Sequence, residues 1–146
     1  KLAELRRQFF GTYKQVNDLE NRIEYIKAAI QTYPNANLEW LNDIKKLELS
    51  IKTTYNKMWG ESHLSKRDIE TLPGIGGRIE TIVYQSWYST SNPTTTNLEQ
   101  YQIALDDYAS IKLTVLNISN SVISLEEKLN TQGIPYTPNR ENFRSE

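Results

Sequence analysis

The sequence predicts an all-α fold, an antiparallel up-and-down bundle of four main helices followed by an extended C-terminal tail. Apolar residues recur at alternating steps of three and four over long stretches, which places them along one helix face. Proline, glycine and asparagine separate these stretches, and 146 residues suffice for one hydrophobic core. We expect residues 1–138 to form the helical domain and residues 139–146 to fray.

The first two helices are expected on either side of Tyr33-Pro34-Asn35. The first carries Leu2, Leu5, Phe9, Val16, Leu19, Ile23, Ile26 and Ile30 on one face, and only Thr12 interrupts that series. Pro34 ends it, because proline disfavours helical geometry in the preceding residue, and Asn35 or Asn37 can cap the next helix. The second carries Trp40, Ile44, Leu47, Ile51, Thr54 and Met58, and Gly60 ends it.

The periodicity lapses between Glu61 and Gly77, where Ser65 is expected to cap a short turn. A third helix is predicted from about Gly77 to Ser89, and its mostly apolar circumference favours burial among neighbours. A fourth helix is predicted to start at the capping box Thr96-Asn97-Leu98-Glu99 and to keep a heptad pattern from Ala104 to Leu129. Beyond Gly133, an extended tail of residues 134–138 is expected to pack on the bundle.

Composition excludes several classes of site. The 17 basic and 18 acidic residues balance, so no global field attracts nucleic acid or an anionic membrane. There is no cysteine, and no apolar run approaches the roughly 20 residues of a membrane helix, so we expect no membrane insertion. The first residue is Lys1, with the heptad pattern already under way, so we expect a fragment of a longer chain.

The segment Leu72-Pro73-Gly74-Ile75-Gly76 matches the hairpin of helix-hairpin-helix DNA-binding modules, with Ile69 as an apolar residue upstream. In such modules the glycine-rich turn presents backbone N–H groups to a phosphate. Glu80 stands where that pattern has a small residue, and residues 61–88 hold three basic against four acidic side chains. We therefore favour a structural turn at Gly74, Gly76 and Gly77, with phosphate contact by these glycines as the alternative and nucleic acid as an unlikely partner.

The remaining polar residues predict no catalytic, cofactor-binding or metal-ligating site. His63 is the only histidine and lacks a partner at metal-ligand spacing. The pairs Asp106-Asp107 and Glu126-Glu127 are adjacent in sequence, point about 100° apart on a helix and are expected on solvated faces. The Gly-Ile-Gly-Gly-Arg segment lacks the Lys-Ser/Thr of a phosphate-binding P-loop.

Tyr84, Trp87 and Tyr88 form the one candidate interaction surface. Amphipathic aromatic side chains are common at binding surfaces, where they stack on a sugar ring or fill a groove of a partner. We favour the simpler expectation that they pack inside the domain or against the tail.

Three segments resemble, in their order, the C-terminal helical region of bacterial sortilin-like proteins. These segments are Gly74 to Ile79, Ser89 to Thr94, and Leu125 to Leu129 followed by Gly133 to Arg140. Those proteins are exported β-propellers with BNR (Asp-box) repeats, often labelled glycosyl hydrolases. The resemblance covers about the whole chain, and the one departure is Asn139, where the family tail usually has a glycine.

This resemblance implies that a propeller precedes the chain and carries any ligand or hydrolase site. The expected function is a non-catalytic accessory and interaction domain without cofactor or metal, in the periplasm, at the cell surface or secreted. Its expected partner is its own N-terminal propeller or another protein chain, with a homodimer as one form. The alternative function is a helix-hairpin-helix nucleic-acid-binding module that uses Leu72 to Gly76.

Overall fold

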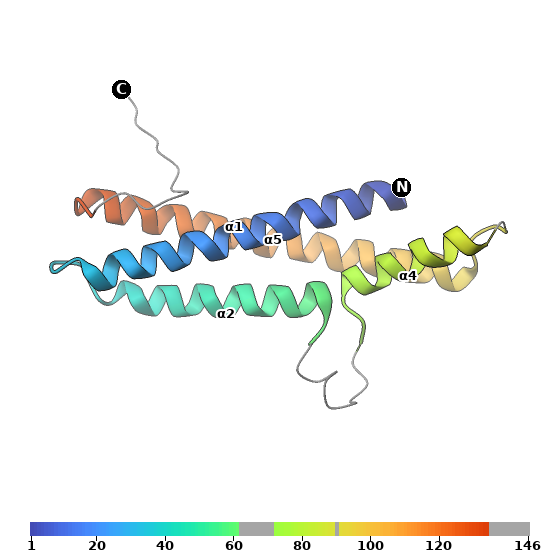
Figure 1. The fold of residues 1–146 in the computed structure, drawn as a ribbon, viewed down its shortest axis with the longest axis horizontal. Coiled ribbons are helices and arrows are strands. Elements are labelled where there is room, and N and C mark those ends of the chain that lie inside the picture. Colours follow the sequence, from blue (N-terminus) through green and yellow to red (C-terminus); the bar gives the residue numbers. More distant parts are fainter. Residues whose placement is uncertain (62–71, 90, 135–146) are drawn as a thin grey trace, which may run out of the picture. The chain divides into compact units, whose positions relative to one another are not determined.

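A computed structural model describes residues 1–61, 72–89 and 91–134, and all regular secondary structure in these ranges is helical (Figure 1). The helices are α1 (Leu2–Thr32), α2 (Trp40–Trp59), α4 (Ile75–Tyr88) and α5 (Thr95–Thr131). The predicted all-α bundle is confirmed. Within the described ranges, no helix combines the length and the apolar character needed to cross a membrane.

The ends of α1 and α2 follow the residues that predicted them. Pro34 lies just beyond Thr32, the last residue of α1. The side-chain Oδ1 of Asn37 accepts a hydrogen bond from the backbone N of Glu39 at 2.9 Å, which supports the turn that leads into α2. Gly60 ends α2 with φ at +86°, a left-handed conformation that glycine adopts without steric cost.

The start of α5 differs from the prediction. The capping box at Thr96 is wrong, because α5 begins at Thr95 and the Oγ1 of Thr94 accepts a hydrogen bond from the backbone N of Asn97 at 3.2 Å. Three consecutive threonines precede Asn97, so several hydroxyls compete for the cap in the sequence. The third helix also starts earlier than predicted, at Ile75.

The end of α5 is a Schellman motif. Gly133 has φ at +69°, its N donates to the carbonyl of Asn130 at 3.1 Å, and the N of Ile134 donates to the carbonyl of Leu129 at 3.0 Å. Ile134 and Leu129 are both buried, as is typical of the apolar residues at these two positions of the motif. The predicted packing of the tail is thus confirmed for Ile134, while residues 135–146, like Ser65, Ile69 and His63, lie outside the described residues.

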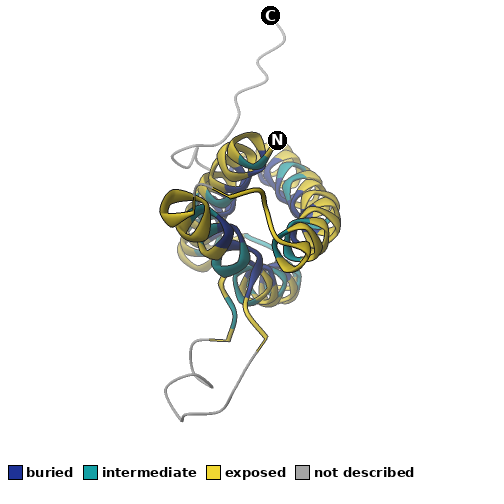
Figure 2. Ribbon diagram, turned by 90° about the vertical axis from the view of Figure 1, so that its right-hand side faces the viewer, coloured by how far each residue is buried: buried dark blue, intermediate teal, exposed yellow. Residues whose placement is uncertain are grey.

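The chain divides into two compact units. Unit 1 comprises residues 1–13 and 53–114, and unit 2 comprises residues 14–52 and 115–146. In each unit the buried residues, dark blue in Figure 2, lie on helix faces that pack on neighbouring helices. Every apolar position that predicted the heptad pattern is buried except Leu2 and Trp40, which are partly exposed at the first residues of α1 and α2.

Unit 2 contains parts of α1, α2 and α5. Its core is aliphatic and consists of Val16, Leu19, Ile23, Ile26, Ile30, Ile44, Leu47, Ile51, Val115, Ile118, Val122, Leu125, Leu129 and Ile134. Lys27 of α1 contacts Glu48 of α2 at 2.8 Å, as expected for antiparallel neighbours joined by a short turn. α5 also runs opposite to α2, so α1 and α5 run in the same direction within this unit (Figure 1).

Unit 2 also buries an ion pair across α1 and α5. The guanidinium of Arg22 donates from Nε to Oε1 of Glu126 at 3.0 Å and from Nη2 to Oε2 at 2.8 Å. The two side chains are only 10% and 4% exposed. The expectation of a solvated Glu126 is therefore wrong. Its position borders the apolar stripe that contains Leu125 and Leu129, whereas Glu127, one residue further round the helix, is exposed.

Unit 1 contains the start of α1, the last turns of α2, all of α4 and the first half of α5. An edge-to-face aromatic cluster joins α1 to α2, with ring centroids 5.2 Å apart for Phe9 and Trp59 and 5.5 Å apart for Tyr13 and Trp59. Thr12, the residue that interrupts the heptad, is buried and shares a hydrogen bond of 2.9 Å with the hydroxyl of Tyr108. Within this unit, α4 runs opposite to α1 and to α5 (Figure 1).

Candidate functional site

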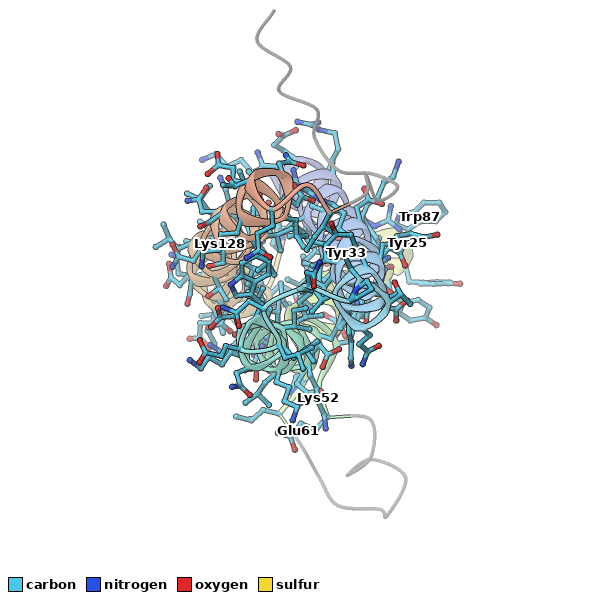
Figure 3. All side chains as sticks on the ribbon, turned by 90° about the vertical axis from the view of Figure 1, so that its left-hand side faces the viewer. Tyr25, Tyr33, Lys52, Glu61, Trp87 and Lys128 are labelled. Atoms are coloured by element: carbon cyan, nitrogen blue, oxygen red, sulfur yellow. The ribbon has the colours of Figure 1, made fainter. Side chains whose placement is uncertain are left out.

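The three aromatic residues of the candidate interaction surface lie on solvent. Tyr84, Trp87 and Tyr88 are 65%, 85% and 78% exposed, so the expectation that they pack inside the domain is wrong, while packing against the tail beyond Ile134 lies outside the described residues. The reason is that α4 already fills its core face with Ile75, Ile79 and Ile82, which lie on the opposite side of the helix. Figure 3 labels Trp87, whose side chain points away from the ribbon.

Two of these aromatic residues pair with each other. The ring centroids of Tyr84 and Tyr88 are 4.6 Å apart, one helical turn along α4. Both rings line an open groove of about 650 Å³, whereas Trp87 does not. We call this feature the α4–α5 groove. It is lined by residues 84–86 and 88–89, at the end of α4, and by residues 91–94 and 96–97, around the start of α5.

Short-range hydrogen bonds fix the rim of the α4–α5 groove. The hydroxyl of Ser86 donates to the carbonyl of Ile82 at 2.7 Å. The hydroxyls of Ser89 and Ser91 bond to each other, and the backbone N of Ser91 donates to Oγ of Ser89 at 3.2 Å. Like the hydrogen bond from the backbone N of Asn97 to Thr94, these bonds join residues that are close in sequence, so the described part of the rim is held by local contacts.

The glycines at the start of α4 have a packing explanation. A Cβ on Gly74 would lie 2.5 Å from the backbone N of Gly60, and a Cβ on Gly76 would lie 2.4 Å from the indole of Trp59. Gly77 has no such contact, since its Cβ would lie 3.7 Å from Pro73. The close approach of the end of α2 thus accounts for Gly74 and Gly76 without a phosphate. Contact of this turn with nucleic acid stays an untested prediction.

The charged residues near that turn are engaged locally. Glu80, which departs from the helix-hairpin-helix pattern, accepts a hydrogen bond from Nε of Arg6 at 2.8 Å. Nη1 of Arg78 donates to Oε1 of Gln100, while its Nε is buried without a partner in the part of the chain that the structure describes. Arg78 borders a small pocket together with Lys57, Asp107 and the backbone at Gly74.

Among residues 1–61, 72–89 and 91–134, no group of three or more His, Cys, Asp or Glu side chains is placed to hold a metal ion. Asp106 and Asp107 are exposed, as expected. Glu4 has its pKa lowered to about 2, mainly by hydrogen bonds from Arg7 and Gln8, and it lies on the surface of the first turn of α1.

Comparison with known proteins adds no relative. No family model matches the chain, and neither a curated protein nor a solved structure shows significant similarity to it. The resemblance to sortilin-like proteins stays a prediction from the motif order, and the function must be argued from the surface itself.

Proposed function

We propose that this chain is a non-catalytic interaction domain of an exported bacterial β-propeller protein, and that it binds another polypeptide through Trp87 on α4. The observation that carries the proposal is the exposure of Trp87, a residue that is 85% exposed near the end of a helix anchored by three buried isoleucines. Exposed aromatic residues on rigid elements are the usual energetic centres of protein interfaces.

The geometry of α4 supports this assignment. Ile75, Ile79 and Ile82 are at most 6% exposed, so they anchor α4 and with it the backbone at Trp87. A partner that covers Trp87 therefore does not have to order the helix backbone, which lowers the entropic cost of binding. The expected partner is the propeller that the resemblance places before residue 1, or a second copy of the chain.

The test compares two aromatic residues of the same chain. Trp87→Ala is expected to weaken binding to the separately expressed N-terminal propeller segment by roughly 30-fold, as removal of an interface centre does. Tyr25→Ala is the matched control, because Tyr25 is a partly exposed aromatic residue of α1. Isothermal titration measures the affinity, and sedimentation equilibrium measures self-association. Equal behaviour of both variants and the parent in both assays refutes the proposal.

A further inference from the structure

The α4–α5 groove has no charged lining. None of its lining residues is Asp, Glu, Lys, Arg or His. Two other grooves differ: one includes Asp43, Lys46 and Lys128, and the other includes Lys57, Arg78 and Asp107. Because an ionic ligand is held by opposite charge, the lining of the α4–α5 groove fits a neutral ligand.

The absence of charge extends along the sequence. The 18 residues from Thr81 to Leu98 contain no charged side chain, although 24% of the whole chain is charged. A surface segment of this length normally carries charges that keep it solvated. Here neutral hydroxyl and amide side chains take the place of charged ones, so the polar groups of the segment carry no charge.

The groove offers two kinds of contact at once. Tyr84 and Tyr88 provide aromatic faces, whose negative quadrupole attracts weakly positive C–H groups. The side-chain amides of Gln85, Asn92 and Asn97 also line the groove and have no hydrogen-bond partner among the described residues. Each amide both donates and accepts, which matches a ligand covered with hydroxyl groups.

We propose that the α4–α5 groove binds a neutral oligosaccharide. A sugar ring presents C–H groups on its face and hydroxyls around its edge, so the face packs on Tyr84 or Tyr88 and the hydroxyls bond to the amides. This inference goes beyond the proposed function, because Trp87 lies outside the groove and a polypeptide partner is not required for it. The open groove predicts weak binding, with a dissociation constant of about 0.1–1 mM.

The test is a titration of the 146-residue chain with cellohexaose, maltohexaose, mannohexaose, xylohexaose and chitohexaose, followed by two-dimensional amide NMR. At least one hexasaccharide is expected to shift resonances of residues 84–97 and to leave those of unit 2 unchanged. Tyr84→Ala and Asn97→Ala are each expected to weaken that binding about tenfold, whereas Trp87→Ala and Tyr25→Ala leave it unchanged.

Three outcomes overturn the inference. One is the absence of shifts with all five sugars at roughly 10 mM, a concentration that detects dissociation constants well above 1 mM. The second is equal binding by the two groove variants and the parent. The third is binding of a charged sugar in place of the neutral ones, in which a hyaluronan hexasaccharide shifts these resonances and the five neutral sugars do not. Because Trp87→Ala separates the two surfaces, failure here leaves the proposed polypeptide contact to its own test.

Discussion

Units 1 and 2 bury polar groups in different ways. Unit 2 places a complete ion pair, Arg22 with Glu126, among aliphatic side chains. Unit 1 instead buries neutral hydroxyl residues, which are Thr54 and the pair Thr12 with Tyr108, beside an aromatic cluster and a tight contact between two helices. Because an unpaired buried charge and an overfilled helix contact are both costly, removal of one partner of the ion pair should damage unit 2, and added volume at the helix contact should damage unit 1.

The largest effect is expected from Glu126→Ala in unit 2. The change leaves the guanidinium of Arg22 buried without its carboxylate, which costs about 3–5 kcal/mol of unfolding free energy. Urea unfolding followed by circular dichroism measures it. The exposed neighbour is the control, since Glu127→Ala should change stability by less than about 0.5 kcal/mol. Equal losses for the two variants would contradict the dependence of unit 2 on this pair.

The next effect tests the steric fit in unit 1. Gly74→Ala places a methyl group against the backbone of Gly60, Trp59 and Met58, at 2.5 to 2.7 Å, and is expected to destabilise the protein by about 1–3 kcal/mol. Thermal unfolding measures the loss. Gly77→Ala is the matched control, because its methyl group meets nothing closer than 3.7 Å and alanine favours the helix. A Gly74→Ala protein as stable as Gly77→Ala would contradict the close contact between Gly74 and the end of α2.

A smaller effect is expected for the hydroxyl pair of unit 1. Tyr108→Phe removes one partner and leaves the hydroxyl of Thr12 buried, at a cost of about 1 kcal/mol. The double variant Thr12→Val with Tyr108→Phe should recover part of that loss, since both polar atoms are then gone. A double-mutant cycle in urea measures the coupling. Additive single effects would indicate that the two hydroxyls do not depend on each other.

The smallest effect concerns the surface pair in the first turn of α1. Arg7→Gln is expected to raise the pKa of Glu4 from about 2 toward its ordinary 4.5, and NMR titration of the carboxyl measures it. Since the folded pKa is lowered, this contribution to stability is complete above about pH 4.5 and disappears as the pH falls toward 2. Arg6→Gln is the control, because Arg6 pairs with Glu80. A Glu4 pKa that stays near 2 without Arg7 would assign the shift to Gln8.

The sequence predicted the helices better than the polar contacts. Heptad spacing identifies the apolar face of α1, α2 and α5, because burial of that face is what selects the helix. The burial of Arg22 and Glu126 could not be predicted in this way, because heptad spacing assigns charged residues to the solvent-exposed face. Their pairing depends on two residues 104 positions apart, which no local spacing encodes.

The prediction that Tyr84, Trp87 and Tyr88 are buried inside the domain was wrong for a related reason. An apolar circumference on α4 predicted burial, but a helix of 14 residues with three buried isoleucines needs only one face for the core. The α4–α5 groove does have a signal in the sequence, the uncharged stretch from Thr81 to Leu98. That stretch alone does not indicate a groove, because the groove exists only where the fold brings residues of its two halves together.

The contact between Gly60 and Gly74 also has a consequence for engineering. Gly60 follows α2 and Gly74 precedes α4, and a Cβ on Gly74 would lie only 2.5 Å from the N of Gly60. The two ends of the segment that joins these helices are therefore next to each other. Lengthening such a segment costs only about 0.6 kcal/mol for each doubling of its length. A fluorescent or affinity domain inserted there should therefore leave the helices of unit 1 in position, and this junction is the natural attachment point for probes of the two proposed binding surfaces.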